Sequence, residues 1–449
     1  MEEMQTVILG KKIKIMKWLL IALIVPSALN AADAVPDAAA KPVYSLDQLY
    51  ELGLKRSEQI KIAGNQLYIA EKDEDRAFSI LFPTFSAYGD YIRYSEESLI
   101  QPKSGYEYGV KLQEQFTING RELILLQAAK DVIAQREYDL DSVSESFLFN
   151  VATAFYDIAN KKKRFEILSE NVTRLKLHKE AVLKKLTLEE VPKTELLRTE
   201  AELSGARTER VRAENELVFA RSSLARLVDI PSDYEIRVTE EPDAMIPPAR
   251  LEDDVDTALK NRSDLKSAQM AIRLAQEDVD LTRSEYWPVL SVEAGYKVQE
   301  TDPEILSGDP SLYAAANLNV VLFDWGLRKG TLGQNNANLS SAELQLKSRT
   351  KEVASEVEKA WLTISTARDA ILSLKDKLKF SRANYDAVLM QFDLGQADSL
   401  DVLDANTLLN NAERELAEAE FYLEISRIGL ERAQGIFLKN IRAIQSDKN

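Results

Sequence analysis

Two hydrophobic periods alternate along this chain, and each predicts a different kind of element. Beyond residue 353, apolar side chains recur at alternating intervals of four and three residues, as on a coiled-coil helix. A helix from about Arg328 to Leu394 would be roughly 100 Å long at about 1.5 Å per residue. Such a length predicts an elongated protein rather than a compact globular one. The heptad seam consists of Val357, Ala360, Ile364, Ala367, Ile371, Leu374 and Leu378. An earlier seam with one polar interruption consists of Phe147, Val151, Ala154, Ile158, Lys161, Phe165, Leu168 and Val172.

Elsewhere the hydrophobic period is two, which predicts strands with one apolar and one polar face. The apolar positions of the two clearest strands are Tyr106, Tyr108, Val110 and Leu112, and then Leu290, Val292, Ala294, Tyr296 and Val298. Residues 84–94 and 311–323 alternate less strictly, so we expect one hairpin in each half of the chain. Such segments are typical of an outer-membrane barrel, although an ordinary soluble hairpin is the commoner explanation of the pattern taken alone.

The chain aligns with itself, which predicts an internal duplication. Pro83 meets Pro288 and Tyr91 meets Tyr296 at an offset of about 205 residues, and Val151 meets Val357 at about 206. Chance explains paired leucines and alanines well, but it explains prolines and aromatics in one register poorly. We therefore expect two tandem structural repeats.

Prolines mark the predicted boundaries, because Pro is costly inside a helix or a central strand. The Pro-rich segment after residue 230 is expected to link the two repeats. The predicted organisation is a signal peptide (1–31), repeat 1 (32–230, with a helix at 45–82, a hairpin at 84–117 and long helices at 120–229), a linker (231–249), repeat 2 (250–440, with a helix at 250–286, a hairpin at 289–323 and long helices at 328–440) and a tail (441–449).

The first 31 residues are typical of an export signal. Lysines precede the apolar run 18–25, and small residues lead to a predicted cleavage after Ala31. A membrane anchor is the less favoured alternative because the run is too short to span a bilayer. The rest of the sequence contains no run of 18 apolar residues, so any membrane-spanning segment is expected to be a β-strand.

Composition and charge exclude several functions. The chain has 57 Lys and Arg against 73 Asp and Glu, a formal net charge of −16, so it lacks the basic footprint of a nucleic-acid-binding protein. It has no Cys, which excludes thiol nucleophiles, disulfides and thiolate zinc sites. Its single His, His178, lies in a Lys-rich stretch and is predicted to be a surface residue. Carboxylates on heptad rods usually form a solvated face, so we expect no enzymatic activity, no metal and no cofactor.

The strand count bears on assembly. Four strands cannot close a membrane barrel, since known single-chain barrels begin at about eight strands and an interior of that size is filled by side chains. Three copies would supply about twelve strands, which allows an open lumen with every strand edge paired.

The sequence also resembles the TolC-type outer-membrane efflux proteins. The resemblance rests on the junctions FPTFSAYGDY, WPVLSVEAGY and LFDWGLR and, most specifically, on the stretch LGQADSLDVLDA, and it extends from about Ser45 to Phe437. It implies a mainly α fold with membrane β-strands. Long antiparallel coiled-coil helices would form a periplasmic α-barrel, and four strands per protomer would contribute to a homotrimeric 12-stranded outer-membrane β-barrel.

The resemblance also implies a function and partners. The chain would be the exit duct of a tripartite efflux or type I secretion system, in the outer membrane of a Gram-negative bacterium and extending into the periplasm. Its implied partners are a periplasmic adaptor (membrane fusion) protein, an inner-membrane efflux or ABC transporter, and outer-membrane lipid. Two other classes stay open: a periplasmic coiled-coil adaptor or structural protein without a pore, and a degradative periplasmic enzyme, for which no convergent polar site is visible.

Several residues acquire roles through this resemblance. Leu394 and Gly395 match the tip turn that contacts the adaptor, and Asp401 and Asp404 match aspartates that form acidic rings at the pore constriction. The alternative for both aspartates is that they are ordinary acids of a first helical turn. Ala397 stands where TolC itself has the arginine of its tip gate, so that form of gating is not expected here.

The first-half tip departs from the same pattern. It has Glu189 where a glycine is expected, with Thr194 and Glu195 as the nearest polar counterparts for adaptor contact. Two local predictions concern the strand-to-helix junctions. Asp324 is expected to cap the helix that follows it. The aromatic residues near the Pro junctions are expected either to form an interfacial belt or to pack the base of the barrel: Phe82, Phe85, Tyr286 and Trp287.

Overall fold

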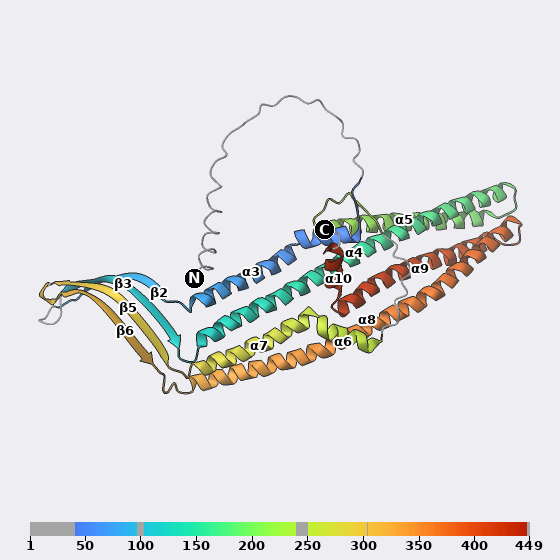
Figure 1. The fold of residues 1–449 in the computed structure, drawn as a ribbon. Helices are drawn as coiled ribbons and strands as arrows, with labels where there is room; N and C mark the ends of the chain where they lie inside the picture. Colours follow the sequence, from blue (N-terminus) through green and yellow to red (C-terminus); the bar gives the residue numbers. More distant parts are fainter. Residues whose placement is uncertain (1–40, 97–102, 239–249, 303, 447–449) are drawn as a thin grey trace, which may run out of the picture. The chain divides into compact units, whose positions relative to one another are not determined.

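The structure is a computed structural model, and it describes residues 41–96, 103–238, 250–302 and 304–446. The predicted signal peptide and most of the predicted linker therefore lie outside the described residues. The described chain is mainly helical and carries few strands. Its four-stranded sheet lies at one end of the long helices, and the turns that join those helices lie at the opposite end (Figure 1).

The helices follow the same order on both sides of the central linker. In each half, two shorter helices precede a hairpin, a long helix and a further helix. The two longest, α4 and α8, have 67 residues each. The bounds are α2 Leu46–Arg56, α3 Glu58–Ser79, α4 Arg121–Thr187, α5 Lys193–Val228, α6 Leu251–Asn261, α7 Ser263–Ser284, α8 Leu327–Asp393, α9 Ser399–Ala433 and α10 Phe437–Ser446, with a 3-10 turn, η1, at Glu304–Leu306.

The heptad seams are where the long helices pack. In α4, Val151 and Ile158 are fully buried, and in α8 Val353 and Val357 are fully buried. α4 packs along α5 and α3, α8 packs along α9 and α7, and α4 contacts both α7 and α9. Apolar burial along two seams accounts for the stability of both 67-residue helices, since helices in proteins are stabilised mainly by packing.

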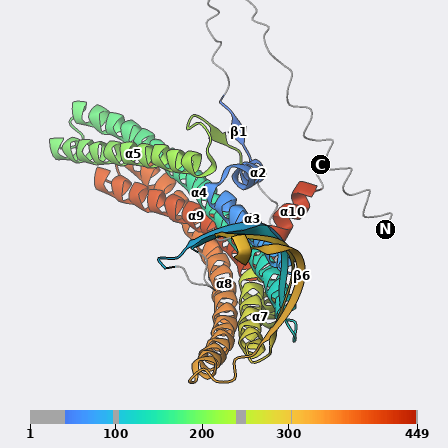
Figure 2. The same cartoon turned by 90° about the vertical axis from the view of Figure 1, so that its left-hand side faces the viewer.

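The strands form one antiparallel sheet in the order β2-β3-β5-β6. Figure 2 shows that this sheet is strongly curved. A separate pair of two-residue strands, β1 (Val43–Tyr44) and β4 (Glu235–Ile236), runs parallel, and β4 falls inside the segment expected to be linker. The sheet strands are β2 Thr84–Arg93, β3 Ser104–Thr117, β5 Val289–Asp302 and β6 Gly308–Asn319.

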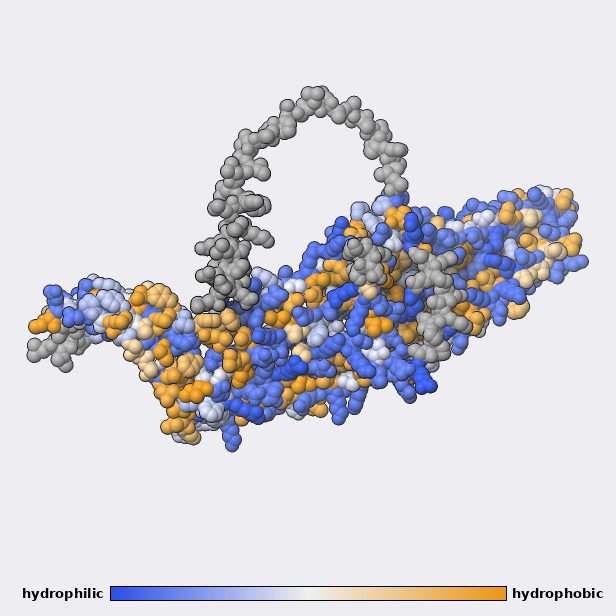
Figure 3. Space-filling model, viewed as in Figure 1, coloured by the Kyte–Doolittle hydropathy of each residue, from blue (hydrophilic) through white to orange (hydrophobic). Residues whose placement is uncertain are grey.

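The period-two alternation is confirmed by the strand register. Directly opposed residues share a face, and the pairs Phe85 with Leu112 and Val110 with Tyr296 lie on one face. Ser86, opposite Lys111, lies on the other face. The sheet therefore has an apolar, aromatic face and a polar, charged face, and Figure 3 shows apolar residues gathered over the sheet and its junctions with the helices.

Two stretches expected as single helices are each divided in the structure. The stretch 45–82 breaks at Ser57, which leaves the helical region at φ −53° and ψ 124°. Its hydroxyl accepts a hydrogen bond from the Ile60 amide, so Ser57 caps α3. The stretch 250–286 breaks in the same way at Arg262, at φ −61° and ψ 125°. Neither break contains a proline, so the proline positions that marked the predicted boundaries did not reveal them.

The expected tail also differs, because it begins inside a helix. α10 extends to Ser446, whereas 441–449 was predicted to be a tail. The physical reason is burial: Phe437, Leu438 and Ile441 join the apolar cluster formed by α2, α4 and α5.

The turn after α9 requires a glycine. Gly435 has φ +69°, and a Cβ there would lie 2.8 Å from the Arg262 backbone nitrogen and 2.9 Å from its Cα. Gly435→Ala is expected to lower the free energy of unfolding by about 1–3 kcal/mol, because it combines left-handed strain with backbone overlap. Denaturant midpoints in detergent, followed by circular dichroism, measure this loss. Gly429→Ala is the control, since a Cβ at that helical site meets no atom within 4 Å; equal midpoints for the two variants would contradict the prediction.

Candidate functional site

The turns that join α4 to α5 and α8 to α9 have the same geometry. Glu189 at φ +64° and Gly395 at φ +76° occupy the left-handed position after each helix. In the first turn the Glu190 amide bonds the Lys185 carbonyl, and in the second the Gln396 amide bonds the Gln391 carbonyl. These are Schellman motifs, which satisfy the last carbonyls of a helix. The first turn therefore holds Glu189 in a conformation that usually favours glycine.

Each turn presents an exposed leucine just before its left-handed residue. Leu394, expected at the adaptor contact, is 68% exposed, and Leu188 in the other turn is also 68% exposed. Leu188 was not singled out from the sequence. The signal was present in the repeat offset of 206, which pairs residues 188 and 394.

The acidic pair, Asp401 and Asp404, lies on the solvent-exposed side of the first turns of α9 in the single chain. Asp401 and Asp404 are both exposed, while Val402, Leu403 and Ala405 between and beside them are buried. Spacing of three residues places both carboxylates on one side of the helix. They point away from the packed interior of this protomer.

Asp401 also has a local structural contact. Asp398 caps α9 by accepting a hydrogen bond from the Asp401 amide at 3.0 Å, and the Asp401 carboxylate accepts one from the Asp398 amide at 3.1 Å. This is a capping box, in which two otherwise unpaired helix donors are satisfied reciprocally. The expectation that Asp401 is a first-turn acid therefore has a geometric basis, whereas Asp404 lies one turn further along.

The remaining predicted tip residues lie on α5. Thr194 is exposed, and Glu195 is half-buried. The Oε2 atom of Glu195 is enclosed and has no hydrogen-bond partner within the described chain. Its backbone carbonyl accepts a bond from the Thr199 hydroxyl at 2.9 Å. Glu195 is therefore partly enclosed by the protein, while Thr194 is open to solvent.

The predicted surface position of His178 is wrong. His178 is only 4% exposed, and its Nε2 atom lies 2.8 Å from the Ser399 hydroxyl at the start of α9. The His178 ring packs edge-on against Phe392, with 5.0 Å between ring centres. The lysines closest to His178 in the sequence lie on other sides of α4. The side that carries His178 is covered by α9 and by the end of α8.

A second set of polar contacts joins α4 to α9 further from the tips. Arg174 donates to Asn406 at 3.0 Å and to Glu413 at 3.1 Å, and Asn406 donates to Asn171 at 2.7 Å. Glu413 also accepts a bond from Arg382 of α8 at 3.0 Å. Because these groups, apart from the exposed Arg382, are largely buried and are mutually bonded, they fix the register of the two helical hairpins.

The polar face of the sheet carries its own network. Tyr313 donates to Glu293 at 2.6 Å, and Lys111 lies 3.6 Å from the same carboxylate. The Tyr88 hydroxyl lies 3.3 Å from Glu107. Gly295 makes room for the Tyr313 ring, because a Cβ there would come within 2.9 Å of it. This face therefore presents hydrogen-bonded charges and phenols.

The strand-to-helix junction shows the predicted cap. Asp324 accepts hydrogen bonds from the Gly326 and Arg328 amides, each at 3.1 Å, at the start of α8. The capping role predicted for Asp324 is confirmed, and the Arg328 side chain also bonds its carboxylate. Arg328 stacks over the Tyr286 ring at 4.4 Å. The other aromatic residues at the Pro junctions, Phe82, Phe85 and Trp287, are all more than half exposed.

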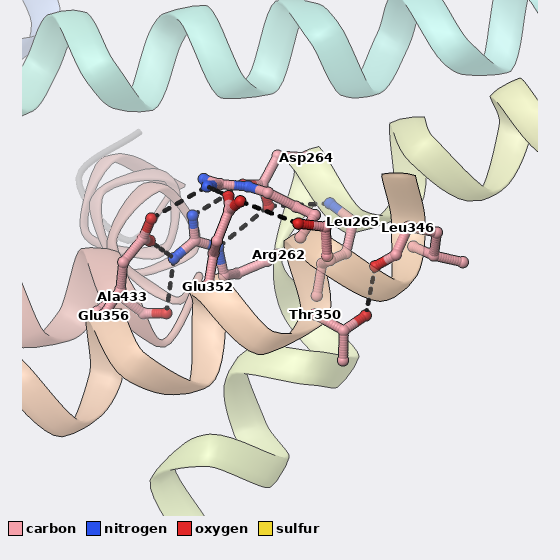
Figure 4. A network of polar contacts seen from close by, with 10 residues as sticks. Arg262, Asp264, Leu265, Leu346, Thr350, Glu352, Glu356 and Ala433 are labelled. Carbon is pink, nitrogen blue, oxygen red and sulfur yellow. Dashed lines mark hydrogen bonds and ion pairs between the residues drawn. The ribbon is translucent and has the colours of Figure 1, made fainter. Parts of the chain in front are cut away.

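A network of charged residues holds the place where α9 ends and α7 begins (Figure 4). Arg262 and Arg349 both bond Asp264 at 2.8 Å and both contact Glu356. Arg262 also donates to the Ala433 carbonyl at the end of α9. Burial alone would raise the pKa of Asp264, but the bonds and charges of the two arginines lower it. The network thus links the start of α7 to the end of α9 and to α8, which are distant in the sequence.

Glu145 of α4 lines a cavity of about 660 Å³ beside this network. Burial raises its pKa to about 7, although the charges of Arg432 and Arg262 oppose the shift. A carboxyl whose folded pKa is raised above its unfolded value lowers stability increasingly as pH rises from about 4.5 to 7.

Glu145→Gln is therefore expected to raise the free energy of unfolding at about pH 7.5 by about 1–2 kcal/mol, after allowance for partial solvent access. The gain should vanish near pH 4.5. Denaturant midpoints at the two pH values test it, with Glu137→Gln, an exposed site on the same helix, as the control. A gain that does not depend on pH would show that ionisation of Glu145 is not its cause.

Neither a membrane helix nor a metal centre is found in the described ranges. Within them, every helix is too short or too polar to cross a bilayer. The same residues bring together no group of three or more His, Cys, Asp or Glu side chains arranged to hold a metal ion.

Comparisons with known proteins find similarity to outer-membrane efflux proteins and channels. Residues 255–435 match the family described as Outer membrane efflux protein. Outer membrane protein TolC of Escherichia coli is 22% identical over 410 residues, which cover 84% of this chain and 81% of that protein. Outer membrane efflux protein BepC of Brucella suis is 20% identical over 69% of this chain and 67% of that protein. The Campylobacter jejuni CmeC outer membrane channel superposes with a TM-score of 0.78 at 18% identity, covering 93% of this chain and 94% of that one.

Proposed function

Because the chain is a TolC-type outer-membrane efflux protein, we propose that it is the exit duct of a tripartite efflux or type I secretion system. It conducts substrates passively from the periplasm to the exterior, and energy comes from an inner-membrane efflux or ABC transporter. The TolC and BepC relatives are outer-membrane proteins, and we propose no catalytic activity for this chain.

The observation that carries the proposal is the two-faced sheet at the end of 67-residue helices. Its outer strands, β2 and β6, each have one edge without a partner in the single described chain. In a homotrimer, β6 of one protomer would pair with β2 of the next and close a barrel of about twelve strands. The apolar face, with Phe85, Tyr296 and Leu312, would then meet lipid, and the polar face would line the lumen.

The same arrangement supports a duplicated chain. We propose that 32–230 and 250–440 are tandem repeats joined by the segment 231–249, because helices, hairpin and tip turn recur in the same order. Each repeat would contribute one hairpin to the barrel and one coiled-coil pair to a periplasmic α-barrel. Residues 1–31 would direct export.

At the helical tips, we propose contact with a periplasmic adaptor. Leu188 and Leu394 each lie exposed beside a left-handed turn residue, with Thr194 on the neighbouring surface. Asp401 and Asp404, three copies of each in the trimer, would form acidic rings that favour cations in a narrow mouth.

The adaptor contact can be tested by substitution. Leu188→Asp combined with Leu394→Asp is expected to reduce the amount of cross-linked adaptor at least roughly tenfold, because exposed apolar anchors dominate such contacts. The measurement is in-cell cross-linking to a co-expressed periplasmic adaptor protein. Leu344→Asp, at a leucine 63% exposed on α8 and 50 residues from Leu394, is the control. Full cross-linking of the double variant would show that the adaptor binds elsewhere.

The function itself is tested by native mass spectrometry of protein extracted in detergent from outer membranes. A mass of three mature chains, together with discrete conductance steps in planar bilayers, is expected. Recovery as a soluble periplasmic monomer without conductance would instead favour a coiled-coil adaptor or structural protein.

A further inference from the structure

One buried histidine joins the two helical hairpins of the protomer close to their tips. His178 lies on α4, and Ser399, the first residue of α9, meets its Nε2 atom at 2.8 Å. The Ser399 hydroxyl also lies 3.1 Å from the Thr199 hydroxyl of α5. Three helices from both hairpins are thus connected by one chain of short polar contacts, within a few residues of the Gly395 turn.

The proton positions in this chain follow from its last member. The Thr199 hydroxyl donates to the Glu195 carbonyl at 2.9 Å, so its oxygen is left to accept from Ser399. Ser399 then accepts from His178, which requires the proton of a neutral imidazole to lie on Nε2. The other nitrogen, Nδ1, is enclosed and has no hydrogen-bond partner among the described residues.

Protonation of this histidine leaves its second ring nitrogen without an acceptor among the described residues. It would place an N–H on Nδ1 in a site that is 4% exposed, where an unpaired donor costs about 1–3 kcal/mol. The Phe392 ring covers one side at 5.0 Å. Lys185 lies 4.7 Å from the centre of that ring and donates to the Phe392 carbonyl, so a second cation is already nearby.

The charged groups around the site do not offset this cost. Burial lowers the pKa of His178, and this effect exceeds the opposing effects of the hydrogen bond with Ser399 and of the Asp393 charge at the end of α8. On α5, Glu195 contributes a backbone carbonyl rather than a carboxylate contact, and Glu200 pairs with Lys179 of α4 at 2.7 Å. On α9, the carboxylates of Asp398 and Asp401 bond each other's backbone amides.

We propose that His178, Ser399 and Thr199 form a pH-sensitive latch that holds the two hairpins together when His178 is neutral and releases the α8–α9 tip in mildly acidic medium. The inference rests on the proposed function for its consequence, a channel mouth that loosens as the periplasm acidifies. It uses contacts within one protomer and does not depend on the acidic pair at Asp401 and Asp404.

The sign of the effect follows from the lowered pKa. A histidine that is harder to protonate in the folded state stabilises the closed contact fully above its ordinary pKa of about 6.5, and that stabilisation is lost as pH falls below it. His178 is the only histidine in the chain, but Glu145, whose pKa is raised by burial to about 7, also titrates in this range. A variant at His178 therefore has to separate the two contributions.

Hydrogen exchange of the purified trimer in detergent tests the latch. Corrected for intrinsic rates, amide exchange in 392–402 is expected to rise roughly threefold or more between about pH 7.5 and pH 5.5. His178→Gln can still donate to Ser399 but does not titrate, so it should remove the pH dependence. Asn406→Ala breaks polar contacts in the same interface and should raise exchange equally at both pH values. A rise with acid that persists in His178→Gln would overturn the proposal.

Two further readouts keep the test decisive if His178→Gln folds poorly. Exchange at the imidazole C2 position of the wild-type protein, followed by mass spectrometry, reports the pKa of His178 directly, and a value at or above about 6.5 would overturn the latch. Planar-bilayer conductance should increase at about pH 5.5 for wild type. Conductance that does not change with pH would contradict the latch but not the proposed channel function. No conductance at any pH would contradict the channel function itself.

Discussion

Glu413→Ala is expected to lower the free energy of unfolding by about 3 kcal/mol or more, because it leaves a buried arginine without its carboxylate. The Glu413 side chain is 7% exposed and bonds both Arg174 and Arg382. Arg174, 18% exposed, would retain its bond to Asn406. Denaturant midpoints of the detergent-solubilised trimer, followed by circular dichroism, measure the loss.

Glu415 provides the matched control on the same helix. It pairs with Lys377 at 2.6 Å, a shorter distance than either Glu413 contact, but both partners are more than 40% exposed. Exposed pairs contribute about 0–1 kcal/mol, so Glu415→Ala should be nearly neutral. If the two variants lost equal stability, burial of the Glu413 network would not be what joins the hairpins.

Removal of the acidic pair should change ion selectivity. Asp401→Ala with Asp404→Ala deletes six carboxylates from the mouth of the proposed trimer. The permeability of anions relative to cations is expected to rise severalfold, because like charges in a narrow pore raise the barrier to anions. Reversal potentials in planar bilayers under a salt gradient measure the change. High salt should reduce the difference between variant and wild type, since it screens exposed charges.

The control removes the same charge from the same helix face. Glu415 and Glu418 are exposed and lie 14 residues beyond Asp401 and Asp404, two heptads from the tip. Glu415→Ala with Glu418→Ala should shift selectivity far less if the narrow mouth controls ion passage. Unchanged reversal potentials in the Asp401 and Asp404 variant would leave the capping box of α9 as the role of Asp401.

Local sequence patterns predicted most of the elements of this fold. The helical seam around Val357 and the alternation around Tyr108 each follow from the geometry of one element, so they can be read without knowing its neighbours. The same applies to Asp324, whose cap bonds span four residues. The repeat offset of 206 residues pairs Leu188 with Leu394, so Leu188 could have been identified from the sequence.

The positions that the sequence left undecided depend on contacts between distant segments. His178 is buried by Ser399, 221 residues away, and nothing in its Lys-rich neighbourhood reveals that partner. The break at Arg262 is fixed by a network that reaches Glu356 and the end of α9.

The sequence by itself thus determined most of the long helices and sheet strands and which of their faces are apolar, but it did not reveal the breaks at Ser57 and Arg262 or the extent of α10. Only the tertiary structure decided which polar groups are enclosed, such as Glu145, Glu413 and His178, and so which of them respond to pH or hold the hairpins together. The physical reason is that backbone periodicity is a local property, whereas desolvation and pairing of a charge depend on every element that packs against it.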